Sequence, residues 1–287
     1  MRELKALAIV IIFTVILYLG IEPFAHTKLN PHVAPADFTF SDLSEVTLVG
    51  DAKNGKETFE MACIACHSLK ADGYEPMLDD LSASEAYGVV VPDLSSAGLI
   101  YDARFLSDLI KEPAHALKLE HKFDDDRPFP MTPFYGLGGD LDQEVADMVA
   151  YLKSVAPKEM SDKDVFVDAC LRCHDMKYAK LFSPTDKASL KTYMGMNPPD
   201  LSMMIRARSA SYLETFINDP QKNLPGTSMP RVGLTKHSQE QVINYMESVG
   251  DSKKAERQKI GIYMMIFFVV FSVIAYMWKR EVWKDLH

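Results

Sequence analysis

The cysteines of this chain fall into two patterns of the same spacing, each with a histidine directly after the second cysteine. The two patterns are Cys63-Ile-Ala-Cys66-His67 and Cys170-Leu-Arg-Cys173-His174, and they contain all four cysteines of the 287 residues. Cys-x-x-Cys-His is the attachment signature of a c-type heme. Two thiols one helical turn apart bond the two vinyl groups of one porphyrin, and the histidine ligates the iron. The sequence therefore predicts two covalently bound heme c groups.

Two other chemistries use a Cys-x-x-Cys pair. One is half of a zinc site and the other is a thioredoxin-like dithiol. Neither requires a histidine directly after the second cysteine, and neither requires the pattern to occur twice. We favour heme and keep zinc or dithiol chemistry as the alternative.

A low-spin heme needs a second axial ligand, which is usually methionine in cytochromes c. The chain has 16 methionines, so position must separate ligands from core filler. Met131 and Met229 stand beside prolines, which stiffen a loop that no helix holds, and each shortly precedes an amphipathic helix. We predict that Met131 ligates the first heme and Met229 the second. The alternatives are His115 or His121 for the first heme, and Met194, Met196, Met203 or Met204 for the second.

Heme propionates need donors when they are partly buried. Arg206 and Arg208 follow the segment Pro199-Asp-Leu-Ser202, which we expect to run along the heme edge. We predict that Arg208, and less strongly Arg206, binds a propionate; the alternative is an exposed basic pair on a helix. Arg104 is a weak candidate at the first heme.

The heme motifs belong to an internal duplication. Four landmarks recur at one constant offset along the chain: Phe59 and Phe166, Cys63 and Cys170, Pro92-Asp-Leu-Ser95 and Pro199-Asp-Leu-Ser202, Pro113 and Pro220. Met131 and Met229 lie closer together than this offset, so the first unit carries about nine extra residues within 114–130. This insertion holds three consecutive aspartates, Asp124, Asp125 and Asp126, and is predicted to be an exposed loop with an acidic tip.

The elements that position the motifs are predicted to be helices. A helix leads through Phe59 into Cys63, and Ser161 with Asp164 three residues later is typical of an N-cap. Apolar residues at spacings of 3, 4 and 7 predict final helices over 142–155 and 238–249. No stretch alternates as a strand does, so the predicted fold is all-α, with tandem class I cytochrome c domains.

Two apolar runs are predicted to cross a membrane, residues 6–21 and 260–278. The second run would span about 28 Å as a helix, close to the ~30 Å hydrocarbon core. No small-x-small cleavage site follows the first run, which favours a retained anchor over a signal peptide. Basic residues before the first run and after the second suggest that both termini are cytoplasmic. Because heme is attached to this motif outside the cytoplasmic membrane, we predict a bacterial inner-membrane protein with periplasmic heme domains.

The predicted organisation has five parts. They are an N-terminal transmembrane anchor (1–24), a linker (25–50), cytochrome c domain 1 (51–157), cytochrome c domain 2 (158–252), and a C-terminal anchor with a cytoplasmic tail (253–287). The net charge is −9, and both ends of the chain are net positive, so the middle is strongly acidic. An acidic exterior suits a basic docking partner and disfavours nucleic acid.

The second unit resembles a known family. Its heme motif is followed by Pro198-Pro-Asp-Leu-Ser202 and Arg206-Ala-Arg208, then by Met229 and a C-terminal membrane run, in that order. From Val165 onward this is similar to cytochrome c1 of the quinol:cytochrome c oxidoreductase (cytochrome bc) complex. The resemblance implies that Arg208 lies at a heme propionate and that Met229 is axial. Cytochrome c1 has one heme, whereas this chain has a further unit in front, as in the diheme subunits that replace cytochrome c1 in some bacteria.

The resemblance implies an electron-transfer subunit without a catalytic site of its own. Cytochrome b and a Rieske iron–sulfur protein would be its neighbours, and a soluble cytochrome c or a terminal oxidase would accept its electrons. One alternative is a diheme subunit of a heme-copper oxidase, which would lack the Pro-Pro-Asp-Leu-Ser segment with its downstream arginines. Another is a diheme cytochrome c peroxidase, which needs one heme with an open coordination site; two methionine candidates argue against it.

Overall fold

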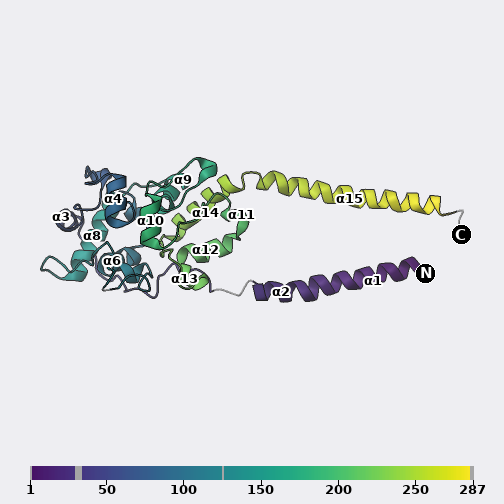
Figure 1. Cartoon of the computed structure of the whole chain (residues 1–287), viewed down its shortest axis with the longest axis horizontal. Helices are drawn as coiled ribbons and strands as arrows, with labels where there is room; N and C mark the ends of the chain where they lie inside the picture. Colours follow the sequence, from purple (N-terminus) through teal and green to yellow (C-terminus); the bar gives the residue numbers. More distant parts are fainter. Residues whose placement is uncertain (1, 30–33, 125, 285–287) are drawn as a thin grey trace.

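The computed structural model describes residues 2–29, 34–124 and 126–284. Parts of the predicted linker (30–33), acidic tip (Asp125) and tail (285–287) lie outside the described residues. Throughout the described part the regular structure is helical, and the only β-pairings are isolated bridges. The prediction of an all-α fold is confirmed (Figure 1).

Each heme unit contains one set of short helices and one long final helix. The helices of the first unit (51–157) are α3 (Ala52–Ala62), α4 (Asp80–Tyr87), α5 (Ala97–Ile100), α6 (Ala103–Lys111), α7 (Pro113–Ala116) and α8 (Leu141–Val155). The helices of the second unit (158–252) are α9 (Asp162–Phe166), which continues as a π-helical turn (Val167–Leu171), α10 (Lys187–Met194), α11 (Met204–Ala207), α12 (Ala210–Asn218), α13 (Pro220–Asn223) and α14 (Lys236–Gly250). The two final helices begin and end within two residues of their predicted bounds.

The duplication is visible in the helices themselves. Helices α4, α5, α6 and α7 recur as α10, α11, α12 and α13, and each copy begins at the same offset that separates Cys63 from Cys170. The 3-10 turns Lys70–Asp72 and Lys177–Ala179 follow this offset too. Helices α8 and α14 have the same length but begin closer together than the offset, because the insertion lies before α8.

A fully buried phenylalanine at the same repeat position begins the core of each unit. Phe59 meets Tyr151 of α8 edge-on, with ring centroids 5.5 Å apart, and Phe166 packs on Tyr245 of α14 at 5.0 Å. Helix α3 crosses α8 closely at Gly55, where a Cβ would lie 1.9 Å from the carbonyl oxygen of Asp147. Each final helix therefore covers the helix that leads into its heme motif.

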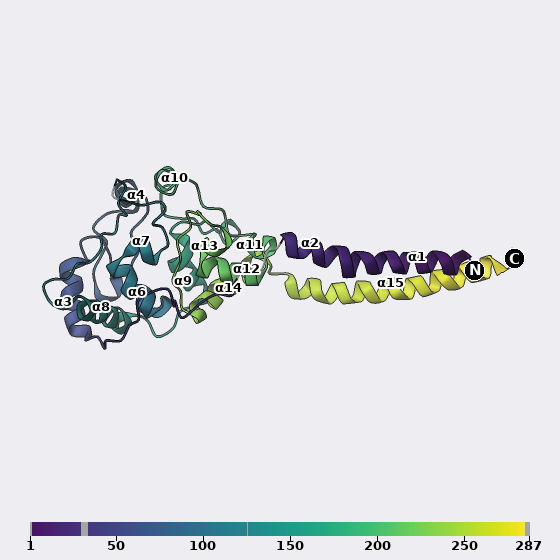
Figure 2. The same cartoon turned by 90° about the horizontal axis from the view of Figure 1, so that it is seen from below.

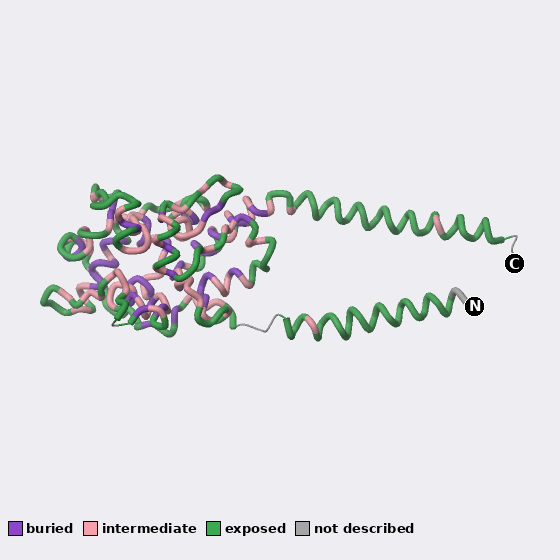
Figure 3. Tube along the Cα trace, viewed as in Figure 1, coloured by how far each residue is buried: buried purple, intermediate pink, exposed green. Residues whose placement is uncertain are grey.

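The two units touch through buried apolar side chains, although the first unit also has a separate core around Phe59 and Tyr151. Ile100 of the first unit is buried in the same cluster as Leu234 and Val165 of the second. An isolated bridge joins Tyr101 to Leu234, and buried stretches occur in both units (Figure 3). The units are therefore held in one fixed arrangement.

The segment between the N-terminal helix and the first unit differs from the predicted linker. Its residues Phe40 and Leu43 are buried against Phe105 and Ala116 of the first unit. Asp37 donates its N–H to the side-chain oxygen of Asn218, in the second unit, at 2.9 Å. Residues 36–43 therefore pack across both units, whereas residues 44–49 are exposed.

Two candidate membrane helices leave the heme units at one end. The first runs continuously from Arg2 to Leu29, through α1 (Arg2–Ile16), a π-helical turn and α2 (Glu22–Leu29), and so extends beyond the predicted anchor. The second is α15 (Lys254–Val282). Both are long and apolar enough to cross a membrane, with mean hydropathies of 2.6 and 2.4 over an 18-residue stretch of each, and both are exposed. They project the same way, so the second unit lies between them and the first unit (Figures 1 and 2).

Candidate heme sites

Both Cys-x-x-Cys-His motifs form the same turn. Helix α3 ends at Cys63, and the N–H groups of Cys66 and His67 donate to its carbonyl oxygen at 3.1 and 2.9 Å. In the second unit the N–H groups of Cys173 and His174 donate to the carbonyl of Cys170 at 3.2 and 3.0 Å. All four cysteines are free thiols in this arrangement. Each motif therefore presents two thiols on one turn with the histidine directly beyond them.

Each motif histidine is oriented by a proline carbonyl. Nδ1 of His67 lies 3.1 Å from the carbonyl oxygen of Pro92, and Nδ1 of His174 lies 2.8 Å from that of Pro199. A proton on Nδ1 donates to the carbonyl and leaves the Nε2 lone pair for a metal. Burial lowers the pKa of both imidazoles, so each remains neutral and able to ligate.

The aspartate of each Pro-Asp-Leu-Ser segment holds the loop that supplies this carbonyl. Asp93 accepts from the Ser95 N–H at 2.9 Å and from the Ser68 hydroxyl, beside His67, at 2.7 Å. In the second unit Asp200 accepts from the N–H groups of Ser202 and Lys177 at 2.7 and 3.4 Å. The segment was predicted to follow the heme edge. Its role in orienting the histidine was missed, although its recurrence at the same distance along the chain from each motif histidine was the available signal.

Met131 and Met229 lie in corresponding irregular segments before α8 and α14, and both are half-buried. Met229 donates its N–H to the Thr227 hydroxyl at 3.3 Å, and the neighbouring Ser228 hydroxyl donates to the Met194 carbonyl at 2.7 Å. Met194 itself is buried in the second unit. Iron ligation by Met131 and Met229 stays a prediction, and their matching positions support it.

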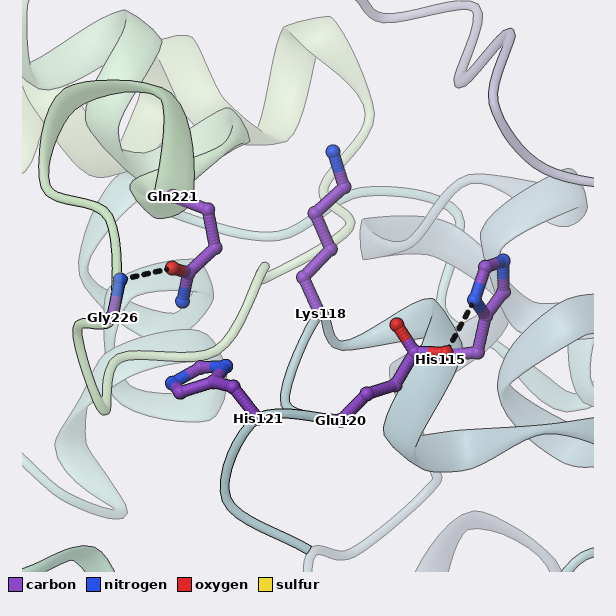
Figure 4. A pocket seen from close by; sticks show the side chains of 6 residues that line it. All are labelled: His115, Lys118, Glu120, His121, Gln221 and Gly226. Carbon is purple, nitrogen blue, oxygen red and sulfur yellow. Dashed lines mark hydrogen bonds and ion pairs between the residues drawn. The ribbon is translucent and has the colours of Figure 1, made fainter.

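The alternative ligands of the first heme lie at an open surface cavity of about 340 Å³ (Figure 4). His115 is paired through Nδ1 with Glu120 at 3.0 Å, and His121 is exposed on the opposite wall. The cavity is completed by Lys118, Gln221 and Gly226. His115 and His121 therefore stay the alternatives to Met131.

The predicted propionate donors are exposed. The guanidinium of Arg208 lies 5.2 Å from the centre of the Tyr212 ring, and Arg206 lies in the last turn of α11. Arg104 is engaged elsewhere, because it donates to the carbonyl of Thr39 at 2.9 Å. The propionate roles of Arg206 and Arg208 stay predictions. The sequence analysis did not single out Arg231, a buried basic residue two positions after Met229.

The two motifs are joined by hydrogen bonds through Thr185. Its buried hydroxyl donates to the carbonyl of Arg172, inside the second motif, at 2.6 Å. The same oxygen accepts from the N–H of Val90, two residues before Pro92, at 3.2 Å. The loop that orients His67 is thus directly connected to the turn that carries Cys173.

The donor set of each site fits heme c. It consists of two thiols for thioether bonds, a neutral imidazole whose Nδ1 is already engaged, and a methionine in a proline-stiffened segment. Within the described ranges no three His, Cys, Asp or Glu residues gather as a metal cluster, so the zinc alternative gains no support. Heme c would be held by Cys63, Cys66 and His67, and by Cys170, Cys173 and His174.

Comparison with known proteins identifies the first unit. Residues 52–156 match the Cytochrome c family. They form a cytochrome c domain. The chain is also 29% identical over 116 residues to cytochrome c of Tetrahymena pyriformis, covering 39% of this chain and 95% of that protein. Covalent heme c and electron transfer follow for this cytochrome c domain.

The similarity to cytochrome c1 indicated by the second motif is confirmed. Cytochrome c1 of Allochromatium vinosum is 25% identical over 151 residues, covering 36% of this chain and 62% of that protein. The ammonia monooxygenase gamma subunit of Nitrosomonas europaea is 24% identical over 205 residues, covering 46% of this chain and 88% of that protein. A chain of a solved hyperthermophilic respiratory Complex III is 22% identical and covers 96% of this chain and 99% of its own length. Its TM-score of 0.32 is too low to carry an argument.

Asp93→Asn should loosen the loop that orients His67, because asparagine keeps only one acceptor oxygen. Burial raises the pKa of Asp93, but hydrogen bonds from Ser95 and Ser68 outweigh it and lower the pKa. The carboxylate therefore stabilises the fold above about pH 3.9, and this contribution is lost as the pH falls through the folded pKa. We expect a loss of about 1 kcal/mol at pH 7 that shrinks in more acid solution, measured by urea unfolding.

Glu57→Gln is the control. Glu57 is an exposed carboxylate on α3 of the same unit, and it lies outside the loop that orients His67. It should leave the free energy of unfolding unchanged. A loss for Asp93→Asn that is the same at pH 7 and at about pH 3 would contradict the role of the ionised carboxylate.

Proposed function

We propose that this chain is a diheme c-type electron-transfer subunit of a membrane quinol:cytochrome c oxidoreductase. The observation that carries the proposal is the repetition of one complete histidine–carbonyl geometry in both units. The second copy lies within the cytochrome c1-like run of motifs. The first copy lies within the domain that matches the Cytochrome c family.

In this proposal each unit holds one low-spin heme c. The first heme is bonded to Cys63 and Cys66 and ligated by His67 and Met131; the second is bonded to Cys170 and Cys173 and ligated by His174 and Met229. The heme supplies a one-electron carrier. The chain fixes the imidazoles, joins the two motifs through Thr185 and surrounds the sites with apolar side chains, which tune the potential.

The proposed setting is the inner membrane of a bacterium, with the heme units in the periplasm. Two candidate membrane helices at one end of the molecule support it. Cytochrome b and a Rieske iron–sulfur protein are the proposed neighbours. A soluble cytochrome c or a terminal oxidase is the proposed acceptor.

We also propose an order of electron flow, from the Rieske protein to the second heme and then to the first. The second unit lies next to the candidate membrane helices, whereas the first unit lies at the far end (Figure 1). The hydrogen bonds through Thr185 connect the two motifs and provide a short covalent and hydrogen-bonded route between them.

The purified chain should contain two covalent hemes, because both motifs form the turn that presents two thiols and a histidine. Heme per polypeptide is measured by the pyridine hemochrome assay after acid–acetone extraction. Cys66→Ala and Cys173→Ala should each change the spectrum of one heme only. One heme per chain, or heme that the solvent extracts, would sink the proposal.

Met131→Leu and Met229→Leu should each remove one methionine sulfur ligand from an iron, while the volume of the side chain stays nearly constant. We expect each variant to lose about half of the far-red sulfur–iron charge-transfer band and to lower one midpoint potential. Met77→Leu, at an exposed methionine of the first unit that is not a candidate ligand, is the control. If Met131→Leu changes neither observable, His115 or His121 becomes the better ligand.

The order of electron flow is tested by rapid mixing of the complex with quinol. In the Met131→Leu complex the first electron should still reach the second heme at the normal rate. In the Met229→Leu complex, reduction of both hemes should slow. The opposite pattern, with entry blocked only by Met131→Leu, would reverse the proposed order.

A further inference from the structure

The insertion of the first unit (114–130) is folded against the second unit, while Asp124 and Asp126 at its tip are exposed, as predicted. Lys122 donates through Nζ to the Ser228 hydroxyl at 2.7 Å and also to the carbonyl of Met194. Arg127 donates to the carbonyl of Thr192 at 3.2 Å. The insertion therefore contacts the residue directly before Met229, although it belongs to the other heme unit.

A cluster of four charged residues joins the residues that follow Met229 to the insertion and to the segment before the first unit. Arg231, whose side chain is 3% exposed, is paired with Asp42 and lies 3.7 Å from Asp219. Lys118 of the insertion reaches both carboxylates, at 3.2 Å from Asp42 and 2.5 Å from Asp219. Removing one member would leave two like charges around one opposite charge, and this is costly because Arg231 and Asp219 are almost fully buried. The cluster thus ties together the packed segment 36–43, the first unit and the second unit.

Backbone hydrogen bonds hold the residues that follow Met229. The Arg231 N–H donates to the carbonyl of Leu117 at 3.0 Å, and the Asp102 N–H donates to that of Gly233 at 2.9 Å. Gly233 has φ +76° and lies against Phe105, where a Cβ would be 2.1 Å from the ring. The residues around Met229 are therefore held by the first unit on both sides.

Among the backbone hydrogen bonds of the described residues, none joins the Met131 segment to the second unit. Farther along this segment, Phe134 donates its N–H to the carbonyl of Ile110, within the same unit, at 3.0 Å. Pro133 occupies the position that Arg231 has after Met229. The two methionine segments thus differ in what holds them, although their units are copies.

We propose that the first unit acts as a clamp on the Met229 segment, with Lys122 as a positioning residue, so that ligation of the second heme depends on the first unit. This rests on the proposed function in one respect, the assignment of Met229 as axial ligand. A methionine thioether is a weak ligand, and Met229 lies in a segment without helical structure. The contacts from the first unit reduce the freedom that this segment would gain when sulfur leaves iron.

The test compares Lys122→Met with Lys111→Met in the full-length Met131→Leu protein, where the remaining sulfur–iron band belongs to the second heme. Lys111 is a matched control, because its ion pairs with Asp108 and Asp142 stay within the first unit. The observable is the pH at which half of the band is lost in alkaline solution. Lys122→Met should lower it by about one pH unit, a tenfold easier loss of the ligand, as expected for removing one charge-assisted hydrogen bond. Lys111→Met should leave it unchanged.

Asp42→Asn provides a second variant at a half-exposed position of the charge cluster, and it should shift the same observable in the same direction. In the Met229→Leu protein, Lys122→Met should leave the band of the first heme unchanged. The clamp is overturned if Lys122→Met behaves like Lys111→Met, or if it shifts both hemes equally. If Met131→Leu keeps the full sulfur–iron band, the assignment of Met131 fails. The band then comes from the second heme alone, so the comparison of Lys122→Met with Lys111→Met still decides the clamp.

Discussion

Both candidate heme sites depend on one kind of hydrogen bond, between Nδ1 of the motif histidine and the carbonyl of a proline farther along the chain. Without it the imidazole could rotate and either ring nitrogen could carry the proton, so Nε2 would not be fixed for iron. The bond requires the proline loop to close back on the motif, which Asp93 and Asp200 achieve by binding backbone N–H groups and a serine hydroxyl. The loop in turn rests on the core built around Phe59 and Phe166. The fold of each unit therefore fixes the orientation of Nε2 of its motif histidine.

Much of this site could be predicted from the sequence because its parts are local. The heme motifs are short and contiguous, the final helices show a clear helical period, and the duplication indicates which methionines correspond. The cap at Ser161 was also predicted, and its hydroxyl accepts the Asp164 N–H as expected. The helical class of the fold followed from these periods.

The contacts that could not be predicted join residues far apart in the chain. Lys118 pairs with Asp219, and Arg231 with Asp42, across separations that no period or short motif records. The insertion was expected to be solvent-exposed because it contains three aspartates. In the structure Asp124 and Asp126 are exposed, but the apolar residues Leu119 and Phe123 are buried and basic side chains of the insertion bind the second unit. The N-terminal helix continues to Leu29 because the polar residues after Glu22 are compatible with a helix, although they end the apolar run.

The duplicated units have thus become unequal in position and in contacts. The second unit lies beside the candidate membrane helices and carries the cytochrome c1-like motifs, whereas the first unit lies farther away and carries the insertion. A chain with two similar electron carriers gains a direction only from such differences. Buried contacts at Ile100 and the hydrogen bonds of Thr185 join the two units directly, which a flexible linker between independent domains would not do.

The most direct test of the central claim is purification of the native complex from the membranes that contain this chain, with identification of its other subunits and a measurement of quinol-dependent heme reduction. The proposed function predicts a cytochrome b and a Rieske iron–sulfur protein in the complex, and reduction of both c-type hemes by quinol. A complex that contains a heme-copper oxidase core instead, or hemes that quinol does not reduce, would contradict it.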